Sequence, residues 1–156
     1  MAKLLLSPLL LIVISFSCNQ STNKNTASDI ELTPEQFQVK ELEAKVLETH
    51  DEVMPLMGNL VSSKDQLEIR NQEISALQDS KAADQVIINN LVINNLDVAY
   101  ELMMDWMRNY HPVDINTNSE ANLKYLQEEM EKITKVQKQV NQAMKSAEDA
   151  LGTTAL

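Results

Sequence analysis

A seven-residue apolar repeat between residues 39 and 74 constrains the fold of this 156-residue chain more than any other feature. The repeat consists of valine, leucine and isoleucine at every seventh position, namely Val39, Val46, Val53, Leu60, Leu67 and Ile74. This period places the side chains on one stripe of an α-helix, which other helices must bury. Thr33, Pro34 and Gln36 are typical of a helix start, because Thr and Gln can form a capping box around a first-turn proline. The sequence therefore predicts a long helix over about residues 34–79.

Pro55 and Gly58 lie inside this repeat. A proline within a helix removes one backbone hydrogen bond and clashes with the preceding turn, so we expect a kink near residues 51–55. The repeat stays in phase across Pro55, which favours one bent helix. A complete break at this point would instead give a four-helix bundle, which is the alternative fold.

Two further amphipathic segments follow, at about residues 84–110 and 119–151. The first ends at His111 because a residue before proline avoids the helical region, and Gly152 is a plausible end for the second. The side chains expected to face the core in the first segment are Ile88, Leu91, Val92, Leu96, Ala99, Leu102, Met103, Trp106 and Tyr110. Those expected in the second are Leu123, Leu126, Met130, Ile133, Gln137, Val140, Met144, Ala147 and Leu151.

The composition agrees with an all-α fold, since two glycines and four prolines leave little material for hairpins or phosphate-binding loops. Short connections between long helices make neighbours antiparallel. We therefore predict an elongated antiparallel three-helix bundle with coiled-coil-like heptads over residues 33–152, followed by a tail at 153–156. The formal charge of −10 argues against binding to nucleic acid, whose phosphates an acidic surface repels.

The N-terminus carries an apolar run from Leu4 to Phe16 after a single basic residue, Lys3. A helix of about 13 residues rises only about 20 Å, which is short for a hydrocarbon core of about 30 Å. The run is therefore typical of a signal peptide. It ends at Cys18, the only cysteine of the chain. This ending resembles the lipobox of bacterial lipoproteins, although Ser15 stands where the lipobox usually has leucine.

The lipobox resemblance implies that residues 1–17 are removed and that Cys18 carries a covalent diacylglycerol and fatty acyl lipid. Residues 18–32 would then form the lipidated cysteine and a flexible tether, since this stretch is polar and has no apolar period. Asn19 follows the cysteine, in place of the Asp that retains many Gram-negative lipoproteins in the inner membrane. We therefore expect an outer-membrane lipoprotein that faces the periplasm, with the inner membrane as the alternative.

Two segments, His50–Met57 and Met103–His111, resemble parts of small Bacteroidota-type bacterial lipoproteins. These proteins are sometimes catalogued as viral A-type inclusion proteins, a label that describes their coiled-coil character. The resemblance covers the signal and most of residues 45–112. It implies no established activity.

The sequence contains no glycine-rich nucleotide loop, nucleophile elbow or HExxH motif, and we do not expect an enzyme. The predicted first helix is longer than its partners, so residues 34–49 are expected to project beyond the bundle. Val39, Leu42 and Val46 would then form an apolar stripe without cover, which is typical of a binding surface. Cover by the 111–118 loop or the tether is the alternative.

The leading functional hypothesis is a membrane-anchored helical module that acts through protein contacts. Its partner would be an unidentified envelope protein or a second copy, bound through the stripe of Val39, Leu42 and Val46. An envelope stress or chaperone-like accessory, which would bind unfolded proteins on an apolar face, is an open alternative. No cofactor is expected beyond the lipid on Cys18.

A second alternative is a periplasmic module that binds copper or haem. Antiparallel pairing of the first two helices is expected to bring six side chains to the same height: His50, Met54, Met57, Met103, Met107 and His111. Thioether and imidazole groups suit Cu(I), and Met/His pairs also ligate haem. Plain packing is the competing interpretation, because methionine commonly fills gaps in helical cores.

Overall fold

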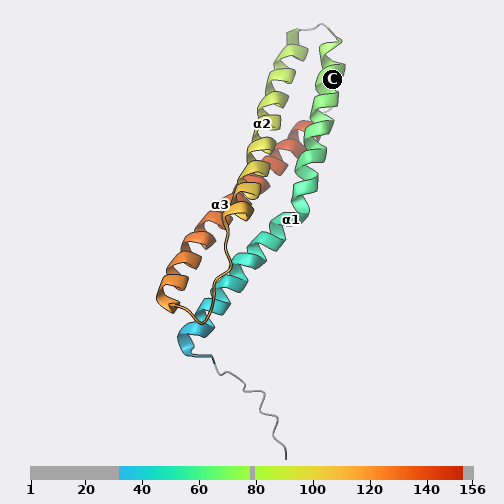
Figure 1. Ribbon diagram of the computed structural model, residues 1–156. Coiled ribbons are helices and arrows are strands. Elements are labelled where there is room, and N and C mark those ends of the chain that lie inside the picture. The colour runs from blue at the N-terminus through green and yellow to red at the C-terminus, as the bar shows by residue number, and fades with distance from the viewer. Residues whose placement is uncertain (1–31, 78–79, 153–156) are drawn as a thin grey trace, which may run out of the picture. The chain divides into compact units, whose positions relative to one another are not determined.

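The computed structural model describes residues 32–77 and 80–152, and within these ranges it forms three α-helices and no strand. Helix α1 spans Pro34–Ser75, α2 spans Ser80–Asn109 and α3 spans Ser119–Gly152. All three pack against one another, with α2 antiparallel to the other two (Figure 1). The predicted three-helix bundle is therefore confirmed. The predicted signal peptide, most of the tether with Cys18, and the tail at 153–156 lie outside the described residues.

Helix α1 begins with the predicted capping box. Thr33 Oγ1 accepts a hydrogen bond from the Gln36 backbone N–H at 3.2 Å, and Gln36 Oε1 accepts one from the Thr33 backbone N–H at 2.9 Å. The helix continues through Pro55 without interruption, and Figure 1 shows that it bends along its length. The chain thus forms one bent helix, as predicted, and not the four-helix alternative.

The seven-residue repeat correctly predicts the core face of α1. Every member is buried, with at most 5% of the side chain exposed: Val39, Val46, Val53, Leu60, Leu67 and Ile74. A continuous repeat of large apolar residues leaves only one way to turn the helix toward its neighbours.

The prediction for α2 is partly wrong. Ile88, Leu91 and Leu102 were expected in the core but lie on the surface. The core position next to Ile88 is taken by Asn89, whose Nδ2 donates to Asn71 Oδ1 at 2.8 Å. Its Oδ1 accepts from Gln85 Nε2 at 2.9 Å. Because the amide oxygen and the amide nitrogen of Asn89 both have hydrogen-bond partners, this polar residue can occupy a core position between the helices. The neighbouring apolar residues then face outward.

The prediction for α3 is correct at every second core position and displaced by one residue between them. The confirmed core residues are Leu126, Ile133, Val140 and Ala147. Leu123, the first expected position, is only half-buried. Met130, Gln137, Met144 and Leu151 are also only half-buried, and the residue before each is buried instead: Glu129, Val136, Ala143 and Ala150. Three of these four are small or medium-sized apolar residues, which suit a helix that packs against two neighbours. The fourth is a carboxylate with its own ion-pair partner.

Residues 34–49 do not project beyond the bundle, which corrects the expectation of an uncovered stripe. Val39 and Val46 are fully buried, and Leu42 packs against the core. The segment after α2 is extended and runs back along α1 (Figure 1). As a result, α3 begins near the N-terminal end of α1 and covers it.

Side-chain hydrogen bonds hold this returning segment on α1. Glu43 Oε1 accepts from the Val113 backbone N–H at 3.0 Å and from the Tyr110 hydroxyl at 3.3 Å. Burial, followed by the nearby Glu43 carboxylate, raises the pKa of Tyr110, so its hydroxyl stays protonated and donates. Gln36 Nε2 donates to the Ile115 carbonyl at 3.2 Å.

At the opposite end, α1 and α2 extend past the end of α3. The Arg70 guanidinium donates to the carbonyls of Ala150 and Leu151 at 2.6 and 3.1 Å, so α3 ends beside Arg70. Beyond this point, within the described residues, α1 and α2 continue without α3 beside them (Figure 1). We call residues 71–75 of α1 and 80–90 of α2 the hairpin tip.

Candidate functional site

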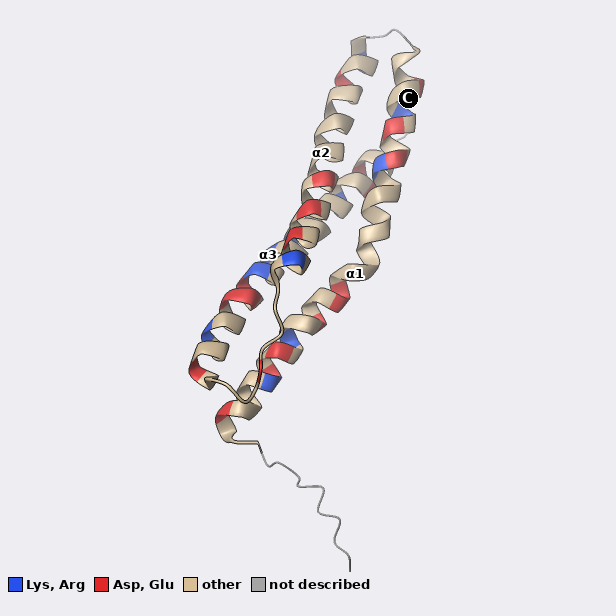
Figure 2. Ribbon diagram, in the orientation of Figure 1, with Lys and Arg blue, Asp and Glu red and all other residues tan. Residues whose placement is uncertain are grey.

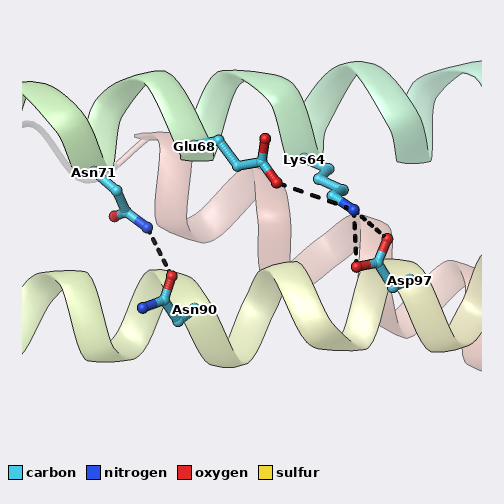
Figure 3. A network of polar contacts seen from close by, with 5 residues as sticks. All are labelled: Lys64, Glu68, Asn71, Asn90 and Asp97. Atoms are coloured by element: carbon cyan, nitrogen blue, oxygen red, sulfur yellow. Dashed lines mark hydrogen bonds and ion pairs between the residues drawn. The ribbon is translucent and has the colours of Figure 1, made fainter.

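Polar contacts between α1 and α2 fix the register of the hairpin (Figure 3). Lys64 Nζ lies 2.7 and 2.9 Å from the two carboxylate oxygens of Asp97, and Asn71 Nδ2 donates to Asn90 Oδ1 at 2.9 Å. The hydrogen bond that Lys64 donates to Asp97 raises the pKa of Lys64. These contacts set the height of α2 against α1, and they lie on the side of α2 that faces α1.

Another side of α2 carries a row of exposed apolar side chains. Ile87, Leu91, Val98 and Leu102 are separated by four, seven and four residues, which places them on one face of the helix. Each is between 40% and 63% exposed, and Ile88 lies exposed beside them. We call Ile87, Leu91, Val98 and Leu102 the α2 stripe. Single exposed apolar residues are ordinary, but a row at helical spacing is typical of a binding surface.

Charged residues are absent from much of this helix. The stretch between Asp84 and Asp97 contains none, and Figure 2 shows it as a tan length of α2. The rest of the bundle is densely charged and acidic overall. The α2 stripe therefore lies on one of the two long uncharged stretches of the described helices, the other being residues 53–63 of α1.

A groove of about 650 Å³ between α2 and α3 adjoins the α2 stripe. Leu102, Trp106 and Val136 supply its apolar part, while Lys132 and Lys135 stand at its α3 side. Leu102 belongs to both the stripe and the groove, so the two form one continuous surface. We call this surface the α2–α3 face.

Trp106, the only tryptophan, is held firmly in the wall of this groove. It is 6% exposed, and its ring centroid lies 4.9 Å from that of Tyr110 and 5.5 Å from that of His50. Among the buried side-chain atoms that the structure describes, its Nε1–H is the one that has no hydrogen-bond partner. A buried donor without an acceptor costs about 1–3 kcal/mol.

The groove also holds a buried carboxylate with a partner at its mouth. Glu129 is buried, and its Oε1 accepts from Lys132 Nζ at 2.7 Å. This hydrogen bond raises the pKa of Lys132. Asp105 pairs with Arg108 on α2. Of the two lysines that line the groove, Lys132 is paired with Glu129, whereas Lys135 has no ion pair within the described residues.

The six side chains of the predicted metal site do not share one environment. Met57 and Met103 are buried in the core, and Met107 packs against it. Met54 is exposed, as is His111. His50 contacts Trp106, and its Nδ1 lies 2.8 Å from Asp51 Oδ1. Within the described ranges no group of three or more His, Cys, Asp or Glu could hold a metal ion. Binding of Cu(I) or haem stays a prediction.

No protein-family model matches this chain, and comparisons with curated proteins and with solved structures find no match either. Of the helices at 34–75, 80–109 and 119–152, none combines the length and hydropathy needed to cross a bilayer.

The α2–α3 face is the strongest candidate site of the described residues, on the basis of its exposed apolar row and its groove.

Proposed function

We propose that this chain is a lipid-anchored helical module of the bacterial cell envelope that binds protein through its α2–α3 face. The observation that carries the proposal is the α2 stripe, a row of exposed apolar residues that runs into a groove beside Trp106. Exposed apolar rows with a polar border support a binding role. Here Lys132 and Lys135 provide that border on α3.

The geometry of the surface favours a helical partner. The α2 stripe follows the spacing of residues in a helix–helix contact. A groove between two helices that pack side by side can accept the apolar side of a third helix. Leu102, which is 40% exposed, provides a large apolar side chain for such a contact, next to the groove wall that Trp106 lines. The proposed site is thus built on rigid elements.

The anchor in this proposal is the lipid on Cys18. Cys18 is the only cysteine and stands where the apolar run ends. Two or more acyl chains hold a protein at a membrane stably, whereas one chain does not. The polar stretch after it would let the bundle reach partners near the membrane, with the periplasmic side of the outer membrane as the proposed location.

The Cys18→Ser variant tests the anchor. We expect the full-length variant to incorporate no labelled fatty acid and to leave the membrane fraction, because serine has no thiol to acylate. Contacts with membrane-bound envelope proteins, captured by a short chemical crosslinker in intact cells, should disappear with it. Ser17→Ala is the matched control, since it keeps a small residue before the cysteine and should behave as the wild type. A Cys18→Ser protein that retains label and membrane association would contradict the proposal.

A further inference from the structure

The α2 stripe is symmetric about the midpoint between Asn94 and Asn95. Ile87 and Leu102 lie at equal distances from this midpoint along the chain, and so do Leu91 and Val98. A two-fold axis through it would pair two antiparallel α2 helices, with Ile87 against Leu102 of the second copy and Leu91 against Val98. Symmetric dimers need a patch that is complementary to itself in this way.

We propose that the α2–α3 face is the interface of an antiparallel dimer and that its occupant is a second copy of this chain. The inference rests on the proposed function, because it names the partner of the same surface. A different helical partner would require an apolar row but no symmetry within it. The symmetric arrangement therefore favours the second copy.

The ends of the molecule complement each other in the same arrangement. At the hairpin tip α2 runs past the end of α3, so within the described residues the helix around Ile87 and Ile88 has only α1 beside it. At the other end of the stripe, Leu102 lines the groove with Trp106. Antiparallel pairing lays the tip of each copy beside the groove of the other. Each contact is then made twice.

The charges of the two ends are also complementary. Asp84 lies next to the stripe at the tip, and the antiparallel pairing brings it to the level of Asp105 of the second copy. Asp105 is already paired with Arg108, whereas Lys135 lines the same groove from α3. Asp84 therefore meets Lys135 of the second copy.

The balance of charge explains how two acidic chains can associate here. Each copy has a formal charge of −10, so most surfaces repel each other. The centre of the α2 stripe is uncharged, and each end brings a carboxylate to a lysine. Complementary charges at the border of an interface favour the correct partner and orientation.

Cysteine crosslinking of the full-length chain in intact cells tests the proposal. Asn94→Cys places a thiol next to the two-fold axis, so a short bismaleimide should link two copies through it. Gln66→Cys, on the exposed side of α1, is the matched control and should give no linked dimer. Under the proposed function the Cys18 sulfur carries the lipid and has no thiol to react, and any unlipidated Cys18 would contribute equally in both variants.

A second substitution in the Asn94→Cys background tests the contacts. Leu91→Glu should reduce the yield of linked dimer by about tenfold, as for other central interface residues, while Ile69→Glu should leave it unchanged. Ile69 is a sound control because it is exposed on α1 to a similar extent, 56% against 63%. Asp84→Lys and Lys135→Glu should each lower the yield, and the double variant should restore it.

Two results would overturn the second copy as the occupant. Asn94→Cys linked to proteins of other masses, with no dimer of this chain, would keep the proposed protein-binding function and assign the face to a different partner. A thiol that links to nothing in cells and reacts only after detergent extraction would place the face against lipid, and it would contradict the proposed function as well.

Discussion

Replacing Trp106 by alanine is expected to lower the free energy of unfolding by about 3–5 kcal/mol, as for other buried large-to-small changes. The indole is 6% exposed and stacks on Tyr110, with His50 on another side. Removing it leaves a cavity at the point where α1, α2 and α3 meet. Denaturant unfolding followed by far-ultraviolet circular dichroism measures the change without depending on the lost fluorophore.

Trp106→Phe is the control for this prediction. It keeps most of the ring and removes the N–H that has no partner, so it should cost less than about 1.5 kcal/mol. The wild-type protein should also show blue-shifted emission, since Trp106 is its only tryptophan. A cost below about 1 kcal/mol for alanine, well short of the buried-aromatic range, would contradict the packing described for α2.

Val46→Glu is expected to unfold at least the N-terminal half of the bundle. Val46 is fully buried in the core that α1 shares with α2 and α3, so the new carboxylate has neither water nor a partner. Burying an unpaired charge is among the few single changes that cost more than about 4 kcal/mol. Thermal unfolding and the helical signal at 25 °C should both fall.

The neighbouring residue provides the control. Leu47 is 40% exposed, and Leu47→Glu should change stability by no more than about 0.5 kcal/mol. If both variants were equally stable and Val46→Glu instead altered self-association, then α3 would not cover α1, and Val39, Leu42 and Val46 would be the exposed stripe that the sequence alone suggested.

The sequence predicted α1 well because its core positions are filled by an unbroken series of valine, leucine and isoleucine. It predicted α2 and α3 less well, since two adjacent positions there compete for the core. At Ile88 and Asn89 the apolar residue was favoured, yet the asparagine is buried because Asn71 of another helix satisfies its amide. The sequence of one amphipathic helix does not reveal such a partner on another helix.

The path of residues 110–118 explains why residues 34–49 were wrongly expected to project beyond the bundle. A short turn at the end of α2 would have started α3 far from the beginning of α1. Glu43, 70 residues earlier in the chain, instead binds the Val113 backbone and holds the segment extended. The groove beside Trp106 depends on the resulting position of α3. Two of the four α2 stripe residues, Leu91 and Leu102, had been assigned to the core. Neither part of the α2–α3 face therefore followed from periodicity alone.

Coverage of the α2–α3 face by protein in the cell is measured most directly by thiol accessibility at Leu102. Leu102→Cys and the control Ile69→Cys are labelled with a membrane-permeant maleimide, first in intact cells and then after detergent extraction and dilution. If the face binds protein, Leu102→Cys should react about tenfold more slowly in cells, the ratio for nine-tenths occupancy, while Ile69→Cys reacts equally in both states. Equal rates for Leu102→Cys in cells and after dilution would show a free face and contradict the proposed function.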